Sequence, residues 1–268
     1  MPGCQRSLAD RWSGSGVSRM LKTLGIVQAC FGAQRSRCNL YRKLRGQSLL
    51  EWVVRRVTDS MRLDGVIVVA SDAAEYGFVT GLVPRDIPLF VSKEPDALGR
   101  FIRALEEYPA EAVVRVRGDN PFVDPGLIDR LVTTAESHAA CDYASFCLRD
   151  GRPAILSPVG ICAEWFRSAA LRKAARAKLT PVERDHVTRY IYSHPEKFQL
   201  RLIPAPPEID RDDVRLTVDI EEDWEHALAI FEAIGPERLD WQRIADLLDH
   251  QPALRKRMAA LNRDYCHG

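Results

Sequence analysis

Short apolar runs alternate with amphipathic segments along most of this chain. The runs are the length of buried strands, as at 66–70, whereas a segment such as SLLEWVVRRVTDSM at 48–61 places apolar residues at helical spacing behind Ser48 as the expected cap. Such alternation is typical of a sheet covered by helices. The pattern therefore predicts a single α/β domain with a mostly parallel central sheet flanked by helices.

The same pattern sets the expected bounds of the elements. Strands are predicted at 24–29, 65–70, 88–91, 111–117, 142–146 and 214–218, with an extended stretch at 201–206. Helices are predicted at 48–61, 98–108, 125–139, 165–177, 182–193, 222–234 and 241–248. Residues 1–19 lack this periodicity and are expected to form a disordered leader, and 251–268 a C-terminal tail. The domain is then 20–250.

Composition and charge remove several classes of protein. The 268 residues carry a net charge of +1, which gives no general reason to expect nucleic acid or an acidic membrane as a partner. The longest apolar runs fall far short of the ~20 residues that cross a bilayer. Seven cysteines without a Cys-x-x-Cys pair favour reduced thiols over a disulfide framework or zinc. We therefore expect a cytoplasmic protein.

Candidate chemistry lies where the predicted strands end, because open parallel sheets bind ligands beyond their carboxyl ends. Polar residues follow four strands: the loop after Ala29, Ser71-Asp72, Gly118-Asp119-Asn120, and Asp219. The two carboxylates of Asp119 and Asp219 could jointly hold Mg²⁺, which prefers hard oxygen ligands shared with substrate phosphates. Alternatively, Asp119 caps a turn and Asp219 caps the helix that follows it.

At this point the chain resembles the cytidylyltransferases of the spore-coat polysaccharide type, relatives of CMP-Kdo and CMP-sialic acid synthetases. The motifs that carry the resemblance are colinear. They are GIVQACFGAQRSRCNLYRKLRGQSLLEWVVRRV at 25–57, DALGRF at 96–101, VVRVRGDNPFVDPGLIDRLV at 113–132, DYASF at 142–146, VERDHVTRYIYSHPEKFQL at 182–200 and RLTVDIEEDWEHALAIFEAI at 215–234.

The resemblance implies a nucleotide-diphospho-sugar transferase-like, Rossmann-like fold and a reaction. A sugar hydroxyl attacks the α-phosphate of CTP, CMP-sugar forms and pyrophosphate leaves, so the protein must orient the partners and neutralise phosphate charge. It also implies a homodimer, which is frequent in the family, and CTP with a sugar acceptor as binding partners.

Site residues carried over by the resemblance fall into three sets. The catalytic set is Arg35, Asp119 and Asp219, of which the two aspartates would bind Mg²⁺. The nucleotide-binding set is Gln28, Ala29, Gly32, Arg35, Ser71, Asp72, Asp96 and Arg100. The acceptor-binding set is Gly160, Glu164, Glu183 and His186. Two alternatives stay open, since Arg100 could pair with Asp96 at i,i+4, and Glu183 and His186 could belong to a set of ion pairs that stabilises a helix.

Two departures from the family pattern bear on activity. In the first loop Cys30 replaces an arginine and Asn39 a lysine; each lost cation costs roughly 3–4 kcal/mol of transition-state stabilisation, which together is about four to six powers of ten in rate. Other basic residues could compensate, namely Arg37, Arg42, Lys43 and Arg45. In the acceptor region PVGICAE at 158–164 has Val159 and Cys162 at two positions that are acidic in the family.

We therefore expect CMP transfer to an acidic or modified sugar for surface glycans, with altered or weakened activity. Two alternatives remain. One is a non-catalytic nucleotide-binding homologue, and the other is a glycosyltransferase that consumes a nucleotide sugar, because one α/β fold hosts several chemistries.

Overall fold

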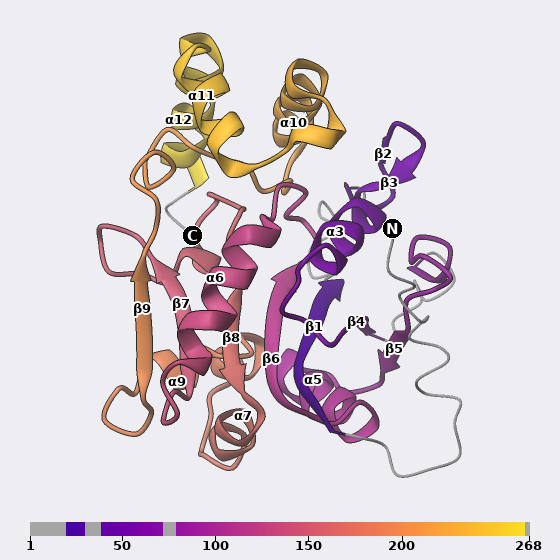
Figure 1. The fold of residues 1–268 in the computed structure, drawn as a ribbon, viewed down its shortest axis with the longest axis vertical. Helices are drawn as coiled ribbons and strands as arrows, with labels where there is room; N and C mark the ends of the chain where they lie inside the picture. The colour runs from indigo at the N-terminus through magenta and orange to yellow at the C-terminus, as the bar shows by residue number, and fades with distance from the viewer. Residues whose placement is uncertain (1–19, 30–38, 72–78, 266–268) are drawn as a thin grey trace.

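The computed structural model describes residues 20–29, 39–71 and 79–265. Within these residues a seven-stranded sheet has the order β5-β4-β1-β6-β8-β7-β9 (Figure 1). Its strands are β1 (Leu21–Ala29), β4 (Gly65–Ser71), β5 (Leu89–Ser92), β6 (Ala110–Arg117), β7 (Tyr143–Cys147), β8 (Glu164–Arg167) and β9 (Leu200–Pro204). Only β8 among them runs antiparallel to its neighbours, β6 and β7. The predicted mostly parallel α/β sheet is confirmed.

Helices cover both faces of this sheet, and alternate side chains of each strand supply the two cores. Val66 and Val68 of β4 belong to the core that includes residues of α3 (Leu49–Thr58) and α6 (Pro125–Glu136). Ile67 and Val69 face the opposite way and belong to the core that includes residues of α5 (Ala97–Glu107) and α7 (Ser168–Ala175). This two-sided burial explains the continuous apolar runs in the sequence.

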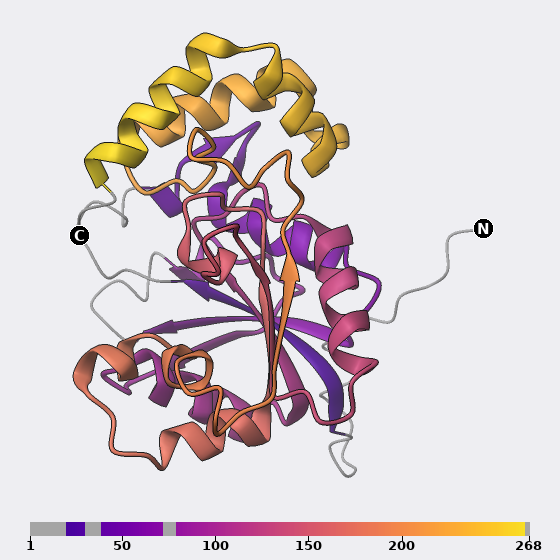
Figure 2. The same ribbon diagram turned by 90° about the vertical axis from the view of Figure 1, so that its left-hand side faces the viewer.

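Beyond the carboxyl ends of β1 and β6 lie three C-terminal helices, shown in yellow tones in Figures 1 and 2. They are α10 (Glu221–Ile234), α11 (Trp241–Asp249) and α12 (Pro252–Tyr265). The prediction of a tail over 251–268 is wrong for α12, because Met258 is fully buried in the core cluster that includes α10 and α11.

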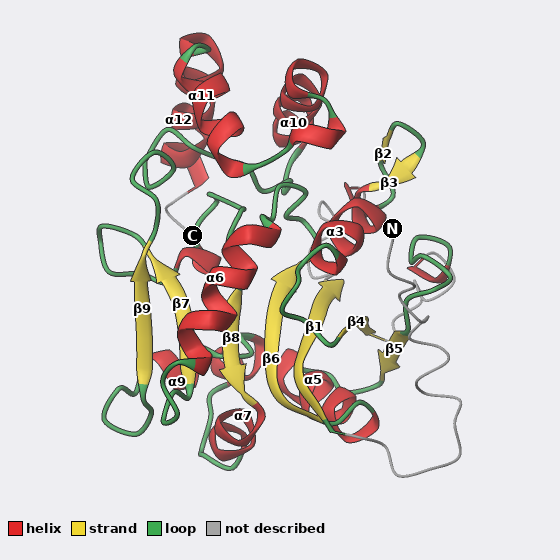
Figure 3. Cartoon of the chain, in the orientation of Figure 1, coloured by secondary structure: helices red, strands yellow, loops and turns green. Residues whose placement is uncertain are grey.

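Three other expectations need correction. The helix predicted at 165–177 begins only at Ser168, since Trp165 and Phe166 belong to β8 and are buried in opposite cores (Figure 3). The helix predicted at 182–193 is two short helices, α8 (Pro181–Asp185) and α9 (Arg189–Tyr192). The strand predicted at 214–218 is an extended segment that hydrogen-bonds to Pro158 and Asp119 rather than pairing with one strand.

A short hairpin follows the first loop. It is built from β2 (Lys43–Leu44) and β3 (Gln47–Ser48), and its turn contains Arg45 at φ 49° and Gly46 at φ 88°. Ser48 then caps α3, as predicted, by accepting from the Glu51 N–H. No helix formed by the described residues is both long enough and apolar enough to cross a membrane.

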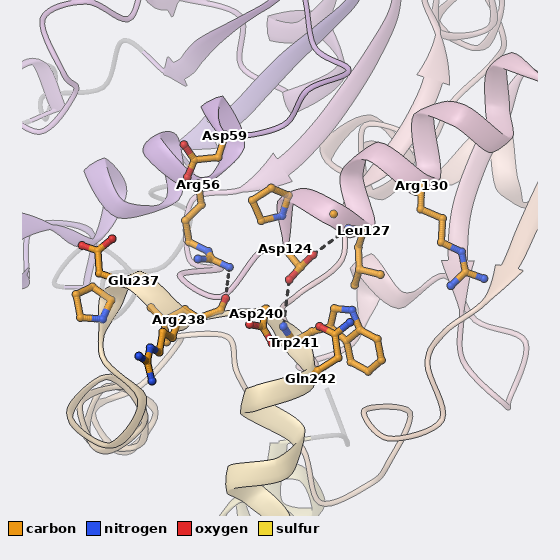
Figure 4. Close-up of a pocket in the computed structure, with 14 residues that line it drawn as sticks. Arg56, Asp59, Asp124, Leu127, Arg130, Glu237, Arg238, Asp240, Trp241 and Gln242 are labelled. Atoms are coloured by element: carbon orange, nitrogen blue, oxygen red, sulfur yellow. Dashed lines mark hydrogen bonds between the residues drawn. The ribbon is translucent and has the colours of Figure 1, made fainter. Parts of the chain in front are cut away.

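Asp124 connects the start of α11 to the start of α6, beside a cavity of about 660 Å³ (Figure 4). One Asp124 oxygen accepts from the Leu127 N–H at the start of α6 (2.9 Å), and the other accepts from the Trp241 N–H at the start of α11 (3.1 Å). The buried guanidinium of Arg56 donates across the same junction to the carbonyls of Val123 and Leu239. One carboxylate therefore caps two helices.

Replacing Asp124 by Ala is expected to lower the free energy of unfolding by about 2–3 kcal/mol, because two buried N–H groups lose their acceptor. The matched control is Asp240→Ala, which removes an exposed cap that binds one helix N–H, that of Arg243, together with the Arg243 guanidinium (3.3 Å), and is expected to cost about 1 kcal/mol. Urea denaturation measures both. Equal losses in the two variants would contradict the double-cap role of Asp124.

Candidate functional site

Asp119 and Asp219 lie side by side although 100 residues separate them. β6 ends at Arg117, and the Gly118 N–H donates to the Gln28 carbonyl (2.9 Å), which ties the ends of β6 and β1 together. The Val218 N–H then donates to the Asp119 carbonyl (2.9 Å), so that Asp219 follows directly beside the turn. The structure thus brings the predicted carboxylate pair together at the carboxyl edge of the sheet.

The guanidinium of Arg117 joins the two carboxylates. Its Nε donates to Asp119 Oδ1 (3.0 Å), and its Nη2 donates both to Asp119 Oδ2 and to Asp219 Oδ1 (3.2 Å). Burial raises the pKa of Asp119; the positive charge of Arg117 opposes that rise, and the nearby Asp219 carboxylate adds to it. The two acids are therefore close enough to repel each other, and Arg117 offsets the repulsion.

Hydrogen bonds within its own segment fix the position of Asp219. Thr217 Oγ1 donates to Asp219 Oδ2 (2.7 Å). The N–H groups of Asp219 and Ile220 donate to Asp223, whose carboxylate is also bound bidentately by Arg215. Asp223 thus supplies the acceptor at the start of α10. The alternative in which Asp219 caps that helix is wrong, which leaves its carboxylate directed at Arg117 and Thr217.

The donor set fits a hard divalent cation. Two carboxylates from different segments converge, and Mg²⁺ commonly takes one or two protein carboxylates and completes its shell with water and phosphate oxygens. The described residues contain no group of three or more His, Cys, Asp or Glu side chains placed to hold a metal. An ion here would therefore depend on the aspartate pair, between which Arg117 lies.

Part of the predicted nucleotide set lies outside the described residues. This holds for Gly32, Arg35 and Asp72, and also for Cys30 and Arg37. Gln28 and Ala29 end β1, and Ser71 ends the neighbouring β4, so all three lie at the edge that carries Asp119. A nucleotide-binding role for these three residues stays a prediction.

Asn39 is described, and it lies at the aspartate pair. Its side chain is buried, and Nδ2 donates to the Val218 carbonyl (3.1 Å), one residue before Asp219. The position at which the family resemblance expects a lysine therefore faces the site, but its amide brings no charge. Of the basic residues that could compensate, Arg42 is paired with Glu221 and stacked over Trp224.

Asp96 and Arg100 have partners within the described fold. Asp96 caps α5 through the Gly99 N–H (2.7 Å) and pairs with Arg184 (2.8 Å). Arg100 donates to the carbonyls of Glu94 and Pro95 (3.0 and 2.9 Å), so the alternative of an Arg100–Asp96 pair is replaced by an Arg184–Asp96 pair. A nucleotide-binding role for either residue stays a prediction.

Gly160 carries the acceptor loop against the segment that leads to Asp219. Its φ of 69° is left-handed, and a Cβ placed there would lie 2.6 Å from the Thr217 nitrogen. The neighbouring Val159 and Cys162 are buried, and burial raises the pKa of Cys162 to about 12. Where the family has acids, this loop therefore offers neither charge nor an exposed polar group.

Glu164, predicted to bind the acceptor, is instead the centre of a buried polar network. Its carboxylate is fully buried and accepts from Arg115 Nε (2.5 Å), from the Tyr143 hydroxyl (2.7 Å) and from Thr188 Oγ1 (2.8 and 3.0 Å). Arg115 in turn donates to Gln28 Oε1 (2.6 Å). Glu164, a member of the predicted acceptor set, is therefore connected through Arg115 to Gln28 of the predicted nucleotide set.

Four residues that bind the site carboxylates were not predicted from the sequence, namely Arg115, Arg117, Tyr143 and Thr188. A signal for the two arginines is present in VVRVR, where charges interrupt an otherwise apolar strand in the middle of the sheet. A charge in a buried strand needs a partner, although the sequence does not say which one.

Glu183 and His186 lie on and just after α8. Glu183 completes a capping box with Thr180, which is a local structural role different from the ion-pair set considered for it. Burial lowers the pKa of His186, and the positive charges of Arg189, Arg115 and Arg117 lower it further. The surroundings of His186 therefore favour its neutral imidazole, and the charges of both site arginines act on it.

The fold and the carboxylate pair define a nucleotidyltransferase-like α/β protein. Among protein families, the sequence pattern of the cytidylyltransferase family matches residues 24–257 of this chain. The chain therefore belongs to the cytidylyltransferase family, a family of nucleotidyltransferase enzymes.

Individual relatives agree with this assignment. An uncharacterized protein of Methanocaldococcus jannaschii is 30% identical over 88% of this chain and 93% of its own length. The spore coat polysaccharide biosynthesis protein SpsF of Bacillus subtilis is 30% identical over 79% of this chain and 87% of its own.

Solved structures share the fold. A cytidylyltransferase from Leptospira borgpetersenii superposes with a TM-score of 0.76 at 20% identity, covering 87% of this chain and 96% of that one. A CMP:2-keto-3-deoxy-manno-octonic acid synthetase complexed with CTP gives a TM-score of 0.59 at 13% identity, covering 79% and 99%. At these identities the likeness shows the fold alone.

Proposed function

We propose that this protein transfers CMP from CTP to an acidic or modified sugar, making a nucleotide sugar for surface glycans. The observation that carries the proposal is the convergence of Asp119 and Asp219 at the carboxyl edge of the sheet. Family membership supports CTP as the donor, and the similarity to a spore coat polysaccharide biosynthesis protein supports a sugar acceptor.

In the proposed mechanism the chain positions two substrates and requires no covalent intermediate. Asp119 and Asp219 would hold Mg²⁺, which neutralises phosphate charge when it is bound. The nucleotide is assigned to the sheet edge that contains Gln28, Ala29 and Ser71, together with Gly32, Arg35, Asp72, Asp96 and Arg100. Gly160, Glu183 and His186 are assigned to the acceptor side, where the neutral imidazole is able to accept the proton of the attacking hydroxyl. Glu164 contributes to the acceptor side indirectly, by holding the Arg115 guanidinium.

Weakened activity is part of the proposal. The buried Asn39 amide places no charge beside Asp219, and Cys30 removes a second cation from the sequence of the loop. The alternative favoured by the same observation is a homologue that binds nucleotide without turning it over. A cytoplasmic homodimer is proposed from the family resemblance, and light scattering on the purified chain tests the dimer.

Pyrophosphate release from CTP, Mg²⁺ and a panel of acidic sugars tests the function. Release by the wild-type chain with at least one sugar supports CMP transfer. Release that appears only in a Cys30→Arg/Asn39→Lys variant identifies the natural chain as the non-catalytic homologue. Absence of release from both, together with no CTP-induced thermal shift, contradicts the proposal. Hydrolysis of a nucleotide sugar without use of CTP would favour a glycosyltransferase.

A further inference from the structure

The Arg117 side chain already binds both carboxylates of the aspartate pair. Its Nη2 atom is within hydrogen-bond distance of a carboxylate oxygen of Asp119 and of one of Asp219 at the same time. Mg²⁺ binds carboxylate oxygens at about 2.0–2.1 Å. A divalent ion bound to both of these oxygens would take up the charge that Arg117 now neutralises, so the guanidinium and the ion compete for the pair.

We propose that Arg117 is a tethered cation that holds the position between Asp119 and Asp219 until a divalent ion arrives with the nucleotide, and that its guanidinium then moves to the triphosphate. This inference rests on the proposed metal-binding function of the aspartate pair. It adds an exchange of cations at that pair and names the residue that performs it.

The Arg117 side chain is more exposed than the side chains of two neighbouring arginines, Arg115 and Arg215. The Arg117 side chain is 34% exposed and stands at the end of β6. Arg115 is buried between Gln28 and Glu164, and Arg215 is buried against Asp223. Of these three arginines, only Arg117 can leave its carboxylates without breaking a fully buried ion pair.

The triphosphate is a suitable destination for the displaced side chain. A guanidinium binds phosphate oxygens with the same planar geometry that it uses for carboxylates. The first loop of this chain carries Cys30 and Asn39 where the family resemblance expects cations. Arg117 would therefore supply to the phosphates a positive charge that these two positions of the sequence lack.

The exchange predicts opposite effects on metal affinity and on turnover. An ion that must first displace Arg117 binds with an affinity reduced by the fraction of sites in which Arg117 has left. Arg117→Gln removes this competitor, so Mn²⁺ alone should bind at least tenfold more tightly. The same variant loses a phosphate ligand, so kcat for CMP transfer should fall about 10²-fold.

Electron paramagnetic resonance titration of the full chain with Mn²⁺ alone, without nucleotide, tests the metal part. The set is wild type, Arg117→Gln, Arg117→Lys, Asp119→Asn and the control Arg211→Gln. Arg211 is also bound bidentately by a carboxylate, that of Asp213, and its side chain is 22% exposed. We expect tighter binding in Arg117→Gln, near wild-type binding in Arg117→Lys and Arg211→Gln, and loss of binding in Asp119→Asn.

Two results would overturn the inference, and they differ in what else they remove. If Asp119→Asn abolishes Mn²⁺ binding while Arg117→Gln leaves the Kd unchanged or raises it, the aspartate pair remains the metal site and only the exchange fails. If Asp119→Asn binds Mn²⁺ as wild type does, the metal role of the pair fails as well. If the glutamine variant does not fold, Arg117→Met also removes the charge, and an unchanged Mn²⁺ Kd in that variant would equally overturn the exchange.

Discussion

Replacing Asp219 by Asn is expected to lower kcat for CMP transfer by about a thousandfold, the scale seen when one preorganised electrostatic group is removed from a reacting centre. The variant keeps the shape of the side chain and its acceptor oxygen for Thr217, but it removes one of the two negative charges that would hold the divalent ion. Steady-state pyrophosphate release under saturating CTP and Mg²⁺ measures the effect.

Asp213→Asn is the matched control for this experiment. Asp213 is also bound by arginines, Arg211 and Arg255, and its side chain is 25% exposed against 32% for Asp219. We expect kcat of the control to stay within about twofold of wild type, because surface ion pairs contribute little. Comparable losses in the two variants would mean that any broken arginine pair slows the protein, and the special role of Asp219 would be lost.

Replacing Glu164 by Leu is expected to lower the free energy of unfolding by about 3–5 kcal/mol, the cost of leaving a buried charge without its partner. Glu164 is fully buried and neutralises Arg115, which is 7% exposed in the middle of the sheet. The change also strands the Tyr143 hydroxyl and the Thr188 hydroxyl, which both donate to this carboxylate. Chemical denaturation with linear extrapolation measures the loss.

A double variant separates the charge effect from loss of packing. If the unpaired Arg115 causes the loss, Arg115→Leu/Glu164→Leu should be more stable than Glu164→Leu alone, because an apolar pair of similar volume replaces an ion pair at little cost. Losses that simply add in the double variant would show that the pair does not act as a unit. Gln28, which accepts from Arg115, links this network to the end of β1, so nucleotide affinity should fall in the single variant.

Local pattern was sufficient for most of the fold. The apolar run at 66–70 predicted a strand, which the structure shows buried on both faces, and Ser48 predicted the start of α3, because burial and capping are decided within a few residues. Trp165 and Phe166 were assigned to a helix because β8 is four residues long and continues directly into α7. The stretch 214–218 was assigned to a strand because an extended segment bonded to two different partners has the same composition as a strand.

The carboxylate pair was predictable for a general reason, and its neutralising partners were not. Asp119 and Asp219 each follow an extended apolar run, and the sheet rule places such residues at one edge. Nothing in the local sequence indicates that Arg117 reaches Asp219, or that Glu164 turns inward to Arg115 rather than outward to a sugar. Those choices depend on contacts between segments 49 to 102 residues apart, which only the assembled fold defines.

The measurement that tests this account most directly is a crystal structure of the full chain with CTP and Mn²⁺, read from anomalous scattering at the manganese edge. The account predicts one anomalous peak within bonding distance of carboxylate oxygens from both Asp119 and Asp219, with the nucleotide phosphates beside it and the Arg117 guanidinium turned away from the pair. Bound CTP with the Arg117 bridge intact and the manganese elsewhere would contradict it.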